Sequence, residues 1–166
     1  DRKAKTRSMM YGNVLKSYVA LKHKSPQTRR PTVFEICGYS HYENIVSNVL
    51  AFFFASDGAH GLGATIVHEF VRSAGKVPQM GDDIWAAERE VRTKTGKLID
   101  IMLVSDENVI VVENKLWAPL YNDLDDYMTF AQDRHDGKTV WGILLCLQNP
   151  PRDICLHGFE VVTYDA

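Results

Sequence analysis

The chain has 166 residues, a net charge of −2 and a 45% hydrophobic fraction, which indicate one globular domain or a piece of a longer protein. No apolar run is long enough to span a membrane and no signal peptide pattern opens the chain, so we expect a cytoplasmic protein without a membrane partner. Three cysteines without Cys-x-x-Cys spacing indicate reduced thiols, which excludes a disulfide framework and a cysteine zinc site.

The charge is divided unevenly along the chain. Residues 1–30 hold nine of the 19 Lys and Arg and one acid, whereas residues 31–166 hold ten bases and 20 acids. We therefore divide the chain into a basic N-terminal helix or arm, 1–30, and a main domain, 31–166, which we expect to be cut short at its C-terminus. The basic segment either contacts phosphate or is an amphipathic helix with solvated flanks.

The hydrophobic pattern predicts helices and strands in a mixed order. Helices are expected over 9–23, 39–55 (with Ser40 as N-cap), 64–74 and 120–135. Strands are expected over 84–93, 97–104, 109–115, 140–147 and 159–163. This order predicts an α/β fold with a mixed central β-sheet that is flanked by helices on both faces.

The two central strands, 97–104 and 109–115, are predicted to form a hairpin. Both are aliphatic on both faces, which is typical of strands that are covered on two sides. A symmetric loop between them pairs Val104 with Val109, so the numbers of paired residues sum to 213.

This register places three charged residues at one end of the sheet. Asp100 lies opposite Glu113, and Lys115 shares a face with Glu113 because it is two residues further along the strand. Two buried carboxylates repel each other, and a divalent cation is the simplest way to make the arrangement tolerable. We interpret the group as an active site, with a surface salt bridge at a strand end as the alternative.

The residues around this group resemble the PD-(D/E)XK nuclease superfamily, through Asp100 followed by Glu113-Asn-Lys115. Upstream, Glu43-x-x-x-Ser47, His60-Gly-Leu-Gly63 and Gly96-x-x-x-Asp100 resemble one bacterial branch of that superfamily with a Glu-Asn-Lys motif. The resemblance covers about residues 35–127 and implies a restriction-endonuclease-like core.

The resemblance implies a metal-dependent nuclease that hydrolyses phosphodiester bonds, with DNA as the expected nucleic-acid partner and a homodimer left open. The expected ion is Mg²⁺, with Mn²⁺ as a substitute, because Mg²⁺ prefers oxygen ligands. The expected ligands are Asp100, Glu113 and Glu43, of which Glu43 rests on the resemblance alone, and the Asn114 carbonyl is a further candidate. Lys115 completes the catalytic set.

Two other functions stay open at this point. One is a nucleic-acid or protein-binding module that keeps the nuclease fold and has weak or no turnover. The other is a metal-dependent hydrolase of a different phosphate ester. The complete set of acids and lysine favours the nuclease.

Four further residues have two readings each. Glu90 faces Asp100 if the turn at 94–96 has three residues, and lies on the other face if the turn has two. His60 is expected in a turn or the core rather than as a catalytic base. Asp123 stands where the bacterial branch has glutamine, in Asp123-Leu-Asp-Asp-Tyr127; we expect it to be solvated on a helix face, with an approach to the metal as the alternative. Tyr127 is expected to pack rather than to contact DNA.

Overall fold

The computed structural model describes residues 33–38, 42–75, 84–116, 123–152 and 154–165. The chain separates into two units, 1–40 and 41–166. Within the first unit the described residues contain one short helix, α2 (Val33–Ile36). The predicted helix over 9–23 lies outside the described residues, and the division into 1–30 and 31–166 stays a prediction.

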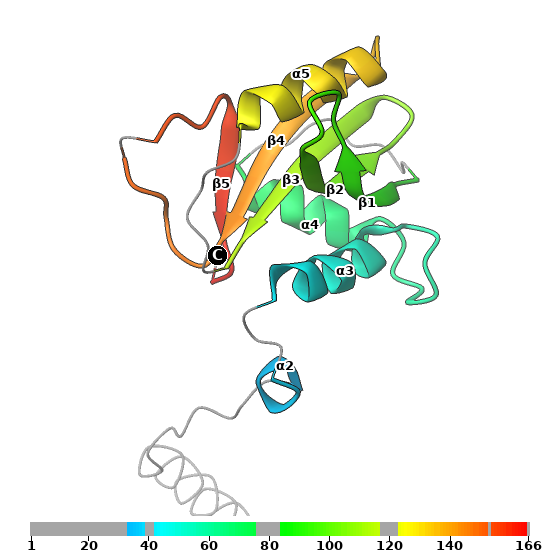
Figure 1. Ribbon diagram of the computed structural model, residues 1–166. Coiled ribbons are helices and arrows are strands. Elements are labelled where there is room, and N and C mark those ends of the chain that lie inside the picture. Colours follow the sequence, from blue (N-terminus) through cyan, green and yellow to red (C-terminus); the bar gives the residue numbers. More distant parts are fainter. Residues whose placement is uncertain (1–32, 39–41, 76–83, 117–122, 153, 166) are drawn as a thin grey trace, which may run out of the picture. The chain divides into compact units, whose positions relative to one another are not determined.

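The second unit is built on a five-stranded sheet in the order β1-β2-β3-β4-β5 (Figure 1). The strands are β1 (Ala86–Arg92), β2 (Leu98–Val104), β3 (Asn108–Lys115), β4 (Thr139–Cys146) and β5 (Phe159–Thr163). The first three strands are antiparallel neighbours, whereas β4 and β5 continue the sheet in parallel with β3. The mixed sheet that the sequence predicts is therefore confirmed.

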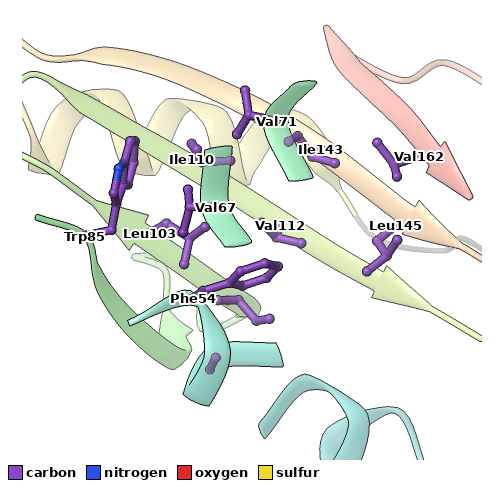
Figure 2. Packing of buried hydrophobic residues seen from close by; sticks show 12 residues of the cluster. Phe54, Val67, Val71, Trp85, Leu103, Ile110, Val112, Ile143, Leu145 and Val162 are labelled. Atoms are coloured by element: carbon purple, nitrogen blue, oxygen red, sulfur yellow. The ribbon is translucent and has the colours of Figure 1, made fainter. Parts of the chain in front are cut away.

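Helices cover both faces of this sheet. The helices α3 (Glu43–Phe54) and α4 (Thr65–Ser73) lie on one face, and α5 (Leu124–Arg134) lies on the other (Figure 1). The core on the α3 side contains Phe54, Val67 and Trp85 packed on strand residues such as Leu103 and Val112 (Figure 2). The core on the α5 side gathers alternate residues of the same strands around Leu124 and Tyr127. The α/β fold with helices on both faces is confirmed.

The helices are shorter at their N-termini than the hydrophobic pattern predicts. The helix α3 begins at Glu43, with Tyr42 at the N-cap position, and the predicted cap Ser40 lies outside the described residues. The helix α5 begins after Asp123, whose carboxylate accepts a hydrogen bond from the Asp126 N–H. Within the described ranges, no helix combines the length and apolarity needed to cross a membrane.

The hairpin of β2 and β3 has the predicted register. Val104 pairs with Val109, and the pairing continues in step to Ile101 and Val112. The Ser105 N–H donates to Asn108 O at 2.9 Å and closes the loop. The charged ends of the two strands are therefore brought to the same end of the sheet, next to the first turn of α3.

Candidate active site

Asp100 lies where the main-chain pairing between β2 and β3 ends. The last paired residues are Ile101 and Val112, and the next N–H of β3 that is turned to β2, that of Asn114, donates to Asp100 Oδ2 at 2.9 Å. The side chain of Asp100 thus takes over from the backbone as the acceptor. This hydrogen bond holds the carboxylate against β3.

The alternation of side chains along β2 is broken at this point. Ile99 and Ile101 are both fully buried but belong to cores on opposite faces of the sheet, although residues two apart in a regular strand share a face. On β1, Glu90 lies between the residues that pair with Ile101 and Ile99, and its φ is +50°, which is rare for a residue other than glycine. The paired strands are therefore distorted at Asp100 and Glu90.

Glu113 and Lys115 form a buried ion pair on β3. The Lys115 Nζ lies 2.7 Å from Glu113 Oε1, and the two side chains are 14% and 0% exposed. Burial, together with the nearby charge of Asp100, raises the pKa of Glu113 to about 7, although Lys115 opposes this shift. Burial alone would lower the pKa of Lys115, but the three surrounding carboxylates outweigh it and raise the pKa. Burial also raises the pKa of Asp100.

Glu43 approaches the same group from α3. Its Oε1 accepts a hydrogen bond from the Leu116 N–H at 2.9 Å, and its Oε2 lies 3.5 Å from Lys115 Nζ. The side chain is 20% exposed. Glu43 is the first residue of α3, where the positive end of the helix dipole favours a carboxylate. The structure therefore brings together the four residues singled out in the sequence: Asp100, Glu113, Lys115 and Glu43.

Sequence reasoning missed Arg89, which joins α3 to this end of the sheet. From β1, its Nε donates to Asn48 Oδ1 at 2.9 Å and its Nη2 donates to Asn44 O at 3.2 Å. Its Nη1 donates to Asp100 O. No motif marks Arg89 in the sequence, because its partners lie 11 or more positions away in the chain.

His60 has a structural place in the loop after α3. Its Nε2 lies 2.8 Å from Ala55 O, and its Nδ1 accepts a hydrogen bond from the Leu62 N–H at 3.0 Å. The second contact requires the tautomer that carries hydrogen on Nε2, which then donates to Ala55 O. Both ring nitrogens therefore hold the loop in shape, in agreement with the prediction that His60 lies in a turn or the core.

The remaining candidates also lie apart from the four central side chains. The Asp123 carboxylate caps α5 and forms a 3.2 Å ion pair with Lys97, so it stabilises the start of this helix. Tyr127 is buried and donates a hydrogen bond from its hydroxyl to Leu98 O at 2.7 Å. The turn before β2 has three residues, so Glu90 does face Asp100 across the strands, but its side chain is exposed.

A family model described as the PD-(D/E)XK nuclease superfamily matches residues 31–154. The chain belongs to the PD-(D/E)XK nuclease superfamily. Comparison with curated proteins and with solved structures gave no significant match. The bacterial branch with a Glu-Asn-Lys motif stays a prediction, and so do the roles of the individual site residues in this superfamily member.

Nucleases of the PD-(D/E)XK superfamily generally use divalent metals, and the residues of the candidate active site fit such an ion. Among the described residues, no three His, Cys, Asp or Glu side chains converge as a closed metal cage. Magnesium does not need one, because it keeps several waters and is commonly held by one or two carboxylates. The negative charge of Asp100 contributes, after burial, to the raised pKa of Glu113, because the two carboxylates repel each other. A cation between them would offset this repulsion.

Proposed function

We propose that the protein is a metal-dependent nuclease that hydrolyses phosphodiester bonds, with DNA as its substrate and Mg²⁺ or Mn²⁺ as its ion. One observation supports this most strongly: the fully buried Glu113 carboxylate is paired with the partly buried Lys115 ammonium, which also contacts Glu43, and the charge of Asp100 is close enough to raise the pKa of Glu113. A salt bridge that served only stability would be an unfavourable use of these buried charges. Family membership supports the same function.

In this proposal Asp100 and Glu113 hold the ion, and Glu43 supplies a third carboxylate once it turns toward the ion from its contacts with the Leu116 N–H and Lys115. The bound ion would polarise the phosphate and lower the pKa of a bound water. The Asn114 N–H holds the Asp100 carboxylate against β3, the strand that carries Glu113. Lys115 keeps a proton on Nζ and stabilises the negative charge that develops on the phosphate during attack by water.

The compartment and the assembly state belong to the proposal as well. The three cysteines are free thiols, two of them exposed, which supports a reducing compartment such as the cytoplasm. A homodimer stays a prediction.

The direct test is a substrate panel for the purified protein. Circular double-stranded DNA, single-stranded DNA, RNA and a small phosphodiester are incubated with Mg²⁺, Mn²⁺ or EDTA, with Asp100→Asn as the matched control. We expect metal-dependent cleavage of DNA by the wild type and none by Asp100→Asn. Tight nucleic-acid binding by both proteins without cleavage would support the binding module instead, and turnover of only the small ester would support the other hydrolase.

A further inference from the structure

Asn114 connects three elements at the end of β3, and it does so from a fully buried position. Its backbone N–H donates to Asp100 Oδ2 of β2, as described above. Its side-chain Nδ2 donates to Ser47 Oγ of α3 at 2.9 Å. Its Oδ1 accepts a hydrogen bond of 2.6 Å from the hydroxyl of Tyr164, which follows β5. One residue thus joins β2 through its backbone, and α3 and the chain after β5 through its side-chain amide.

Tyr164 helps to fix which way this amide points. Its backbone N–H donates to Cys146 O at 3.2 Å, which continues the pairing of β5 with β4 by one more residue. The Tyr164 hydroxyl donates to Asn114 Oδ1, and burial raises the pKa of this hydroxyl, so its proton stays available for the hydrogen bond. With the amide oxygen on Tyr164, Nδ2 faces α3, where the Glu43 carbonyl can only accept, so the contact with Tyr164 and the contact with Glu43 favour the same amide orientation.

The amide orientation matters for Glu43, the first residue of α3. The same Nδ2 donates to Glu43 O at 3.4 Å in addition to Ser47 Oγ, so it ties down the first turn of the helix. The Glu43 carboxylate in turn contacts the Leu116 N–H and Lys115. If the amide turned over, its oxygen would face the Glu43 carbonyl and that contact would be lost, although the Ser47 hydroxyl could still donate to the amide oxygen. The helix end would be less fixed.

We propose that Tyr164 is a positioning residue of the candidate active site, which acts through Asn114 to hold the first turn of α3 and the Glu43 carboxylate beside Lys115. This inference rests on the proposed function for its consequence in catalysis, where a small misplacement of a reacting group is costly. Its structural part can be measured without metal or substrate. A merely structural role would instead lower global stability and leave the position of Glu43 unchanged.

The test compares amide hydrogen exchange in the wild type, in Tyr164→Phe and in Ser105→Ala, all in metal-free buffer. The Leu116 N–H is the probe, because it donates to Glu43 Oε1. Ser105→Ala is the control, because it removes a buried hydroxyl that accepts from the Asn108 N–H at the far end of the hairpin. The Val111 N–H, in the middle of β3, reports on the global opening of the sheet.

We expect the Leu116 amide of Tyr164→Phe to exchange about three- to tenfold faster than that of the wild type, the change produced by loss of one hydrogen bond. Its ratio to the Val111 rate should rise in this variant and not in Ser105→Ala. Ser47→Ala, which removes the acceptor on α3, should give the same ratio change, and the double variant should show less than the product of the two. An unchanged ratio in Tyr164→Phe would overturn the inference.

A second readout separates this inference from the proposed function. The dissociation constant for Mn²⁺ should be about three- to tenfold higher in Tyr164→Phe than in the wild type, and equal to wild type in Ser105→Ala. A wild type that binds no Mn²⁺ would overturn the proposed function, while the exchange ratio would still decide the role of Tyr164. Metal binding by the wild type with no change in Tyr164→Phe would overturn the positioning role.

Discussion

The Lys115 ammonium lies 2.7 Å from the Glu113 carboxylate, at the end of a strand where Glu113 itself is fully buried. It also lies 3.5 Å from Glu43, so one ammonium neutralises part of the charge of two acids. In the absence of an ion, Lys115 is therefore the internal counter-charge of the site. Binding of a cation should change the balance among these charges, and the predictions on metal, pH and Lys115 depend on that balance.

Divalent metal should stabilise the wild type. An ion that binds only the folded protein at 100 times its dissociation constant adds about 2.7 kcal/mol, which is roughly 5–10 °C in Tm for a domain of this size. Thermal unfolding with Mg²⁺ or Mn²⁺, at constant ionic strength, should show this shift in the wild type and a much smaller one in Asp100→Asn. Equal shifts in both proteins would place the binding site elsewhere.

Without metal, the stability of the protein should fall as the pH rises from about 4.5 to about 7. The pKa of Glu113 is about 7 in the folded state, against 4.5 as its ordinary value, so the folded protein holds a proton that the unfolded chain releases. The contribution of this group is thus fully present below pH 4.5 and lost as the pH passes 7. The raised pKa of Asp100 acts in the same direction.

The measurement is urea unfolding with EDTA at pH 5 and pH 7.5, for the wild type and for Glu113→Gln. The glutamine cannot titrate, so the loss of stability between the two pH values should be smaller in the variant. A loss of the same size in both proteins would show that Glu113 has an ordinary pKa.

Arg89→Lys should reduce both stability and cleavage. Lysine keeps the charge but cannot reach the three acceptors at Asn44, Asn48 and Asp100, so α3 and β2 lose a shared contact. We expect a loss of about 1–3 kcal/mol in the free energy of unfolding. The control is Arg92→Lys on the same strand, whose exposed side chain donates to Gly96 O. Its effect should stay within about 0.5 kcal/mol.

The hairpin register could be predicted because the loop is short and symmetric, which pairs Val104 with Val109. Continued by one residue beyond the last observed pair, Ile101 and Val112, that register places Asp100 opposite Glu113. Glu90 could not be assigned in the same way, since its place depends on whether the preceding turn has two or three residues. The hydrogen bond from the Thr93 N–H to Lys97 O settles that turn.

Contacts between distant parts of the chain could not be predicted. Tyr164 lies 50 positions after Asn114, and Arg89 lies 41 positions after Asn48, so no local spacing links them. Glu43 needed the family resemblance, because its helical pattern alone is that of an ordinary surface glutamate. The N-cap formed by Asp123 could have been predicted from the local sequence. Its position in the motif, where the bacterial branch has glutamine, raised a contact with the metal as the alternative to solvation.

His60→Ala should keep cleavage and lose stability. The ring holds the loop after α3 through Ala55 and Leu62, and these contacts are absent in alanine. We expect a lower Tm together with a rate constant close to that of the wild type at a temperature where both proteins are folded. A loss of cleavage without a loss of stability would identify His60 as a participant in the reaction.

The measurement closest to the central claim compares Lys115→Ala with the wild type in both metal binding and cleavage of DNA. We expect the variant to fold and to bind Mn²⁺ as tightly as the wild type or more tightly, because the internal counter-charge is gone. Its cleavage rate should fall by about 10²- to 10³-fold or more, as when a group that stabilises the transition state is removed. Lys115→Met, which keeps the apolar stem, should show the same loss. Metal-dependent cleavage at the wild-type rate by carefully purified Lys115→Ala would contradict the account.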